Sequence, residues 1–201
     1  VEEFREFCAS GGGDWDPDTT AVEATWEAAL AGAGLAARAA RAALDGADGS
    51  DTPFALSRPP GHHATADDAG GFCFLNNAAI GAQAALDAGA DRVAVLDWDA
   101  HHGDGTQEIF YDRGDALVFS VHEADLFPPT GEVAETGTGA GEGATVNAPL
   151  PAGAGDPEYR LVFEEVVEPV VGRFDPDLLV VSAGFDAHRH DPISRLRLST
   201  A

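Results

Sequence analysis

Lysine and methionine are absent from this 201-residue chain, and positive charge is scarce. All eleven basic residues are arginine, against 35 aspartates and glutamates, which gives a net charge of −24. A field of this sign repels nucleic acid and anionic membrane surfaces, so we expect neither as a direct partner. Because salt screens the self-repulsion of such a chain, the composition predicts a halophilic or salt-rich cytoplasm. A GC-biased genome that favours Ala, Gly, Arg, Asp and Glu is the alternative explanation.

Cysteine is also rare, and long apolar runs are missing. Two cysteines, Cys8 and Cys73, cannot make a disulfide framework, so we expect a cytoplasmic protein, with Cys73 as a buried, inert thiol. Apolar runs such as Leu178–Val181 are far shorter than the roughly 20 residues of a membrane span. No leader pattern opens the sequence. Val1 is not a natural start, so we expect one domain over residues 1–201 that is trimmed or part of a longer protein.

Helical and extended patterns alternate along the chain. Helices are predicted at Val22–Leu44, Asn76–Ala88, Thr106–Tyr111 and Glu158–Phe174. Strands are predicted at Pro53–Ser57, Arg92–Leu96, Ala116–Val121 and Asp177–Ser182, and loops at Gly11–Thr20 and Leu126–Asn147. This alternation is typical of an α/β protein, here a three-layer α/β/α arrangement with a largely parallel sheet.

Chemically active side chains follow the predicted strands. Asp97, Asp99 and His101 come just after one strand, and Asp186 follows another. In open α/β sheets ligands bind beyond the carboxyl ends of the strands. Alternate residues of an extended chain share a face, and one histidine with two carboxylates suits a catalytic zinc ion. A solvated turn is the alternative for the Asp97–His101 segment.

Two adjacent histidines, His62 and His63, follow a stiff turn that contains Pro59 and Pro60. A histidine pair can supply both a base and an acid near neutral pH, provided that carboxylates orient the two rings. Asp97 and Asp104 are the candidate carboxylates. The alternative is a surface pair that binds metal adventitiously or has no function.

Other candidates have simpler explanations. We expect His102 to be a structural histidine, and His188 and His190 to be surface residues. Gly71 and Phe72 lie in a glycine–aromatic segment that either walls an apolar slot or belongs to the core.

Five ordered segments together resemble the histone deacetylase family, within the arginase/deacetylase fold. They are RPPGHHA at 58–64, GGFCFLNNAAI at 70–80, VAVLDWDAHHGDGTQEIFY at 93–111, FSVHE at 119–123 and VVSAGFDAH at 180–188. The first segment looks like class II enzymes and bacterial acetylpolyamine amidohydrolases.

The resemblance implies roles for particular residues. Asp99, His101 and Asp186 match the zinc ligands, with Fe²⁺ as an alternative metal. His63 matches the general base and His62 its electrostatic or acid partner; the family pairs His62 with Asp97 and His63 with Asp104. Phe72, after Gly71, matches one wall of the acyl-lysine tunnel. A structural K⁺ or Na⁺ site would involve Asp97, Asp99, His101, Ser120 and Val121.

The implied activity is zinc-dependent removal of acetyl from acetyl-lysine, an acetylated polyamine or another small amine. The family usually places an oxyanion-binding tyrosine or histidine in a later glycine-rich turn, and this chain stops at Ala201. Tyr111 and Tyr159, on predicted helices, are poor substitutes, so we expect weak zinc binding and activity of the 201-residue piece alone. Alternatives are a non-catalytic acyl-lysine-binding or scaffold protein and, less favoured, a two-metal ureohydrolase. Oligomeric state is not predicted.

Overall fold

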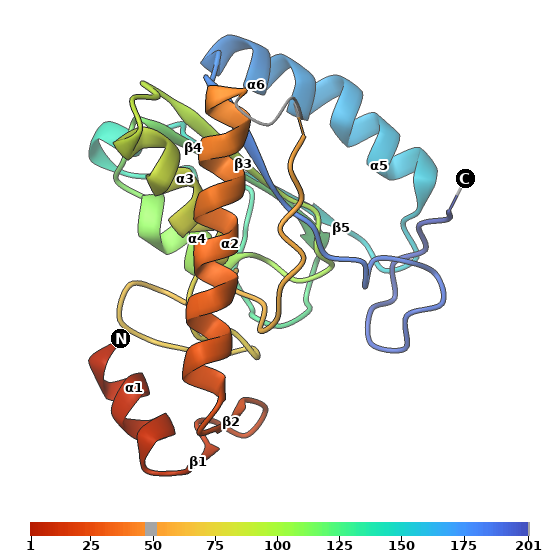
Figure 1. The fold of residues 1–201 in the computed structure, drawn as a ribbon. Coiled ribbons are helices and arrows are strands. Elements are labelled where there is room, and N and C mark those ends of the chain that lie inside the picture. Colours follow the sequence, from red (N-terminus) through yellow and green to blue (C-terminus); the bar gives the residue numbers. More distant parts are fainter. Residues whose placement is uncertain (47–51, 201) are drawn as a thin grey trace.

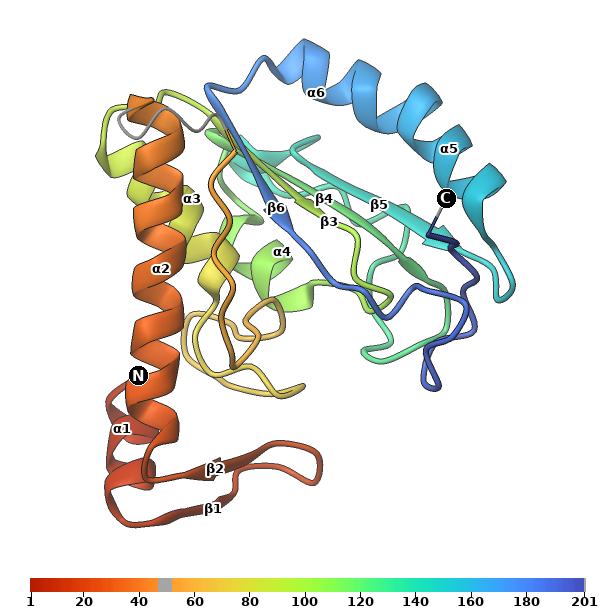
Figure 2. The same cartoon turned by 45° about the vertical axis from the view of Figure 1, so that its right-hand side comes forward.

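A four-stranded parallel sheet with helices on both faces forms the centre of the molecule (Figure 1). The structure, a computed structural model, describes residues 1–46 and 52–200. Strand order is β5-β4-β3-β6, and every neighbouring pair is parallel. Figure 2 shows α5 and α6 on one side of the sheet and α2 and α3 on the other. The predicted three-layer α/β/α arrangement is confirmed.

The elements largely follow the predicted pattern. The sheet strands are β3 (Val93–Asp97), β4 (Ala116–Glu123), β5 (Thr145–Leu150) and β6 (Leu178–Ser182). The helices are α1 (Glu2–Ala9), α2 (Thr25–Asp45), α3 (Asn77–Asp87), α4 (Asp104–Phe110), α5 (Asp156–Val162) and α6 (Glu168–Phe174), with the 3₁₀ turn η1 (Gly139–Gly141) and the π turn η2 (Phe163–Val167). A small hairpin, β1 (Gly12–Asp14) and β2 (Thr20–Val22), precedes α2.

Each face of the sheet has its own apolar core. Val93 and Val95 of β3 pack with the alanines of α3 on one face. On the other, Leu96 and Phe119 pack with residues of α5, η2 and α6. Side chains alternate between the faces of a strand, so a sheet covered on both faces needs the continuous apolar runs seen in β3 and β4. The two central strands, β3 and β4, are therefore packed on both faces, and the segments that leave their carboxyl ends start from a well-packed part of the fold.

Three predictions about elements were wrong. Pro53–Ser57 forms no strand within the described residues: it is extended, but it pairs with no other described segment, and Phe54 and Leu56 are exposed. Gly11–Thr20 contains β1 and the first residue of β2 rather than only loop. Leu126–Asn147 contains η1 and the start of β5. The prediction failed because the many glycines and threonines of this segment are not typical of a strand, and β5 gains its stability by pairing with β4.

The helical segment near the end of the chain is continuous but irregular. It runs from Asp156 to Phe174, slightly longer than predicted, and changes to a π turn at Phe163–Val167. Pro169 follows this turn and has no N–H to donate to the preceding turn, which explains the local change in helix type. In the described part of the chain, no helix is both long and apolar enough to cross a membrane.

Candidate active site

Three side chains that could bind a metal converge where β3 and β6 end. Asp99, His101 and Asp186 each offer one ligand atom, and these atoms lie within 4.8 Å of one another. The parallel pairing of β3 with β6 places Asp97 beside Ser182, so the segments that follow the two strands emerge together. The predicted cluster of Asp99, His101 and Asp186 is thus present in the fold.

His101 lies between the two carboxylates of this cluster. Its Nδ1 is 2.7 Å from Asp186 Oδ2 and 3.0 Å from Asp99 Oδ1. The hydrogen bonds to Asp186 and Asp99 raise the pKa of His101 to about 10, against the opposing effect of burial. One imidazole nitrogen and two carboxylate oxygens this close to one another are a group that could hold a metal ion.

Backbone N–H groups orient both carboxylates. The amide of Ala100 donates to Asp186 Oδ1 at 2.8 Å, and the amide of His101 donates to Asp99 Oδ1 at 2.9 Å. Gly184 permits this close approach, because a Cβ atom there would lie 2.1 Å from Asp99 Oδ2. The geometry of the cluster is therefore imposed by the backbone on both sides of it.

Asp97 does not join this cluster. Its Oδ2 is 2.9 Å from His62 Nδ1, and its Oδ1 accepts a hydrogen bond from the amide of Asp99 at 3.0 Å. The simple expectation that Asp97, Asp99 and His101 share a face fails here, because the chain turns immediately after β3. The pairing of Asp97 with His62, expected from the family resemblance, is what the structure shows.

The two adjacent histidines stand beside the cluster, each held by its own carboxylate. His63 Nδ1 is 2.6 Å from Asp104 Oδ1, at the start of α4. The imidazole centroids of His62 and His63 are 4.0 Å apart, and His62 Nε2 is 3.9 Å from Asp99 Oδ1. Both histidines are buried, which argues against an unstructured surface pair.

The two imidazoles differ in their affinity for protons. Burial lowers the pKa of His62, but the Asp97 carboxylate more than offsets this, so the pKa rises to about 9. Burial also lowers the pKa of His63, and the hydrogen bond with Asp104 offsets it only in part, so the pKa stays below its ordinary value. Near neutral pH such a pair contains one neutral imidazole, His63, which is available to accept a proton, and one cationic imidazole, His62.

Two phenylalanines lie in segments that contact His63. Phe72 is exposed, and its φ of 67° is rare for a residue with a side chain. Gly71 before it lies against His63, since a Cβ atom there would be 2.4 Å from that ring. Phe127, which the sequence interpretation missed, packs edge-on against His63 with centroids 5.3 Å apart. Its signal was an aromatic residue directly before Pro128 and Pro129 in a loop that leaves a strand end.

The remaining predicted residues also have defined positions. Ser120 and Val121 lie in β4, with Ser120 beside Asp97 in the sheet register. His102 is buried and hydrogen-bonded to Thr130 and Gln107, as expected of a structural histidine.

His190 is exposed, whereas His188 is half-buried with a buried Nε2 atom, so the prediction of His188 as a surface residue was wrong. Cys73 is fully buried, as predicted.

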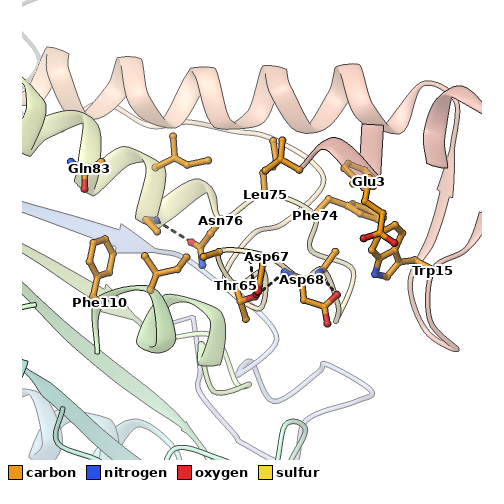
Figure 3. Close-up of a pocket in the computed structure, with 17 residues that line it drawn as sticks. Glu3, Trp15, Thr65, Asp67, Asp68, Phe74, Leu75, Asn76, Gln83 and Phe110 are labelled. Atoms are coloured by element: carbon orange, nitrogen blue, oxygen red, sulfur yellow. Dashed lines mark hydrogen bonds between the residues drawn. The ribbon is translucent and has the colours of Figure 1, made fainter. Parts of the chain in front are cut away.

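A separate pocket of about 280 Å³ lies between α1, the loop at residues 65–69, α3 and α4 (Figure 3). Phe4, Trp15 and Phe74 give it aromatic walls, and Asp67 and Asp68 also line it. None of the residues lining it belongs to the histidine pair or the three-ligand cluster. The pocket is therefore distinct from both groups of chemically active side chains.

Comparison with known sequences agrees with this geometry. The sequence model described as "Histone deacetylase domain" matches residues 1–201. A "Probable deacetylase" of Archaeoglobus fulgidus is 49% identical over 196 residues, which cover 98% of this chain and 54% of the relative. "Acetylpolyamine amidohydrolase 1" of Pseudomonas aeruginosa is 44% identical over 191 residues, covering 92% of this chain and 54% of the relative. The chain belongs to the histone deacetylase family.

Solved structures show the same fold. The crystal structure of the HDA15 HD domain superposes with a TM-score of 0.94 at 40% identity, over 98% of this chain and 58% of that one. An acetylpolyamine aminohydrolase from Burkholderia pseudomallei gives a TM-score of 0.84 at 46% identity, over 90% of this chain and 53% of that one. The chain thus spans about half the length of the relatives that it matches.

Proposed function

We propose that this chain carries the catalytic centre of a metal-dependent deacetylase that hydrolyses an acetamide to acetate and a free amine. The observation that supports this best is the juxtaposition of the Asp99–His101–Asp186 cluster with a buried, carboxylate-oriented histidine pair. A pure binding protein needs no such pair. The names of the relatives agree with this reaction class.

The donor set fits zinc. One imidazole nitrogen and two carboxylate oxygens are ligands that zinc accepts, and a catalytic zinc site keeps a further position open. Bound there, zinc would act as a Lewis acid toward an amide carbonyl and would lower the pKa of water toward about 7. Fe²⁺ is the alternative metal. Structural K⁺ or Na⁺ near Asp97 and Ser120 is a further proposal, supported by the adjacent positions of these residues in the sheet.

The two histidines would accept and donate the protons that hydrolysis transfers. His63 presents Nδ1 to Asp104, so its Nε2 is the atom free to accept a proton from the attacking water. His62 presents Nδ1 to Asp97 in the same way and acts as the electrostatic or acid partner when the amine leaves. Each carboxylate fixes the orientation and tautomer of its ring.

The substrate side of the site would be apolar. Phe127 packs on His63, and Phe72 follows Gly71, which lies against the same ring. Both phenylalanines are exposed, and aromatic side chains suit the methylene chain of an acetylated lysine or small amine. The large negative charge would also attract cationic substrates, such as polyamines or basic protein segments.

The test is acetate release from an acetyl-lysine peptide and from an N-acetylated diamine. The protein should be expressed with any flanking sequence that its gene encodes. We expect hydrolysis with zinc, loss of activity with a chelator, and a fall in kcat of roughly 10²-fold or more for Asp104→Asn. Glu108→Gln, an exposed change on the same helix, is the control and should behave as wild type.

Other outcomes separate the alternatives. Tight binding of the acetyl-lysine peptide without acetate release would indicate a binding or scaffold protein. A ureohydrolase would require a second metal position, and the described residues hold a single candidate cluster. Activity that survives full metal removal would contradict the proposal.

A further inference from the structure

The loop between β4 and β5 carries Phe127, and a group of side-chain hydrogen bonds ties it to the protein interior just after that residue. Thr130 Oγ1 is 2.9 Å from His102 Nδ1, and His102 Nε2 is 3.1 Å from Gln107 Oε1. Gln107 Nε2 donates to Glu135 Oε2 at 2.6 Å, and the Glu135 carboxylate accepts the amide of Gly131 at 3.2 Å. Because Gly131 follows Thr130, these contacts close a ring.

The direction of every bond in this ring can be assigned. Gln107 Oε1 also accepts from Asn147 Nδ2 at 2.7 Å, so it serves as an acceptor toward His102 as well. His102 then carries its proton on Nε2, and its Nδ1 accepts the hydroxyl proton of Thr130. Each donor has an acceptor, and a fully satisfied network of this kind holds its members in one geometry.

Close steric contact also holds this loop against the protein interior. Gly131 has a φ of 88°, and a Cβ atom there would lie 2.7 Å from His102 and 2.6 Å from His122. The backbone of the loop therefore lies directly against two buried imidazoles. Only glycine suits this position, by conformation and by space.

We infer that this hydrogen-bonded ring, which we call the loop clamp (Thr130, His102, Gln107 and Glu135), positions Phe127 against His63. Phe127 lies three residues before Thr130 and packs on His63. Gln107 belongs to α4, whose first residue, Asp104, holds His63 Nδ1. One helix thus fixes both the imidazole and the loop that borders it.

Thr130, Gln107 and Glu135 are accordingly positioning residues for substrate binding. They lie outside the three-ligand cluster, and their hydrogen bonds within the loop clamp go to His102, Gly131 and one another. The part of this inference that concerns substrate rests on the proposed function. The clamping of the loop itself does not.

The test compares Thr130→Val, which keeps the shape but removes the hydroxyl, with Thr130→Ser, which restores it. Thr130 is an exposed residue, so both variants should fold. In Thr130→Val we expect amide hydrogen exchange over residues 126–135 to accelerate roughly tenfold, as the loss of one neutral hydrogen bond allows. The KM for an acetyl-lysine peptide should rise about fivefold or more, with kcat within about twofold, because only positioning changes.

The results discriminate clearly. Wild-type exchange rates over residues 126–135 in Thr130→Val would overturn the clamp. A fall in kcat with unchanged KM would overturn the positioning role. Return of the exchange rates and of KM to wild-type values in Thr130→Ser would support both the clamp and its positioning role. If the wild-type protein hydrolyses no acetamide, the proposed function fails, while hydrogen exchange still supports or contradicts the clamp.

Discussion

At the scale of single residues, the site depends on close approach as much as on ligand chemistry. Gly184 lies against Asp99, where a Cβ atom would be 2.1 Å from Oδ2 and 2.6 Å from Cα. The Asp99 side chain could rotate away from the first contact, but the contact with the backbone Cα cannot be relieved in that way. The space beside residue 184 therefore controls whether Asp99 and Asp186 can point at a common centre.

Gly184→Ala should accordingly weaken metal binding. The added methyl group forces Asp99 out of position, and disturbing the support of a metal ligand typically costs about 10- to 100-fold in affinity. Zinc affinity measured by competition with a chromophoric chelator would show this. Gly172→Ala is the matched control, since nothing lies within 4 Å of its Cβ position. Equal zinc affinity in Gly184→Ala and wild type would show that the contact is unimportant.

The sequence was sufficient to predict the cluster of Asp99, His101 and Asp186, but not how the neighbouring side chains are oriented. The strand-end rule found Asp99, His101 and Asp186 because parallel strands deliver their carboxyl ends to one edge. It could not show that Asp97 turns toward His62, since that depends on the dihedral angles of a tight turn. Phe127 was missed because its contact with His63 joins two loops that are far apart in sequence, which no local pattern records.

At the scale of elements, the start of α3 connects the histidine loop to the rest of the fold. Asn76 caps this helix by accepting from the amide of Ala79 at 3.0 Å. Its Nδ2 donates to the carbonyl of Ala64 at 2.9 Å and to Thr106 at 3.1 Å. One buried side chain therefore ties the segment after His63 to both α3 and α4.

Asn76→Ala should destabilise the fold by about 2–3 kcal/mol. The loss combines a helix cap, worth about 1 kcal/mol, with buried partners left unsatisfied. Urea unfolding would measure it. Asp87→Ala, at the exposed end of the same helix, should change stability by less than about 0.5 kcal/mol. If Asn76→Ala lowers the free energy of unfolding as little as Asp87→Ala does, the stabilising role of Asn76 is contradicted.

Elements with strong local signals were predictable, and those that depend on tertiary pairing were not. The apolar runs of β3 and β4 and the alanine-rich α2 and α3 agree with prediction to within a few residues. Strand β5 contains Thr145 and Asn147 and gains its stability by pairing with β4. Pro53–Ser57 has the composition of a strand but no partner among the described residues, so composition alone misled.

At the scale of the whole molecule, function follows from topology. Parallel pairing of β3 with both β4 and β6 brings polar residues that are distant in sequence to one edge of the sheet. The alternation of helices and strands was sufficient to predict this layered arrangement. The histidine pair comes from a loop outside the sheet, and the family resemblance was needed to predict which carboxylate holds each ring.

The most direct test of this account is the zinc content of the protein, measured by elemental analysis together with the visible spectrum after cobalt substitution. In the protein expressed with any flanking sequence that its gene encodes, we predict one divalent ion per chain in the wild type, and loss of the ion and of the cobalt spectrum in Asp186→Asn. Asp175→Asn removes an exposed carboxylate of equal charge and should keep both. Full metal content and an unchanged cobalt spectrum in Asp186→Asn would contradict the assignment of Asp99, His101 and Asp186 as the metal site.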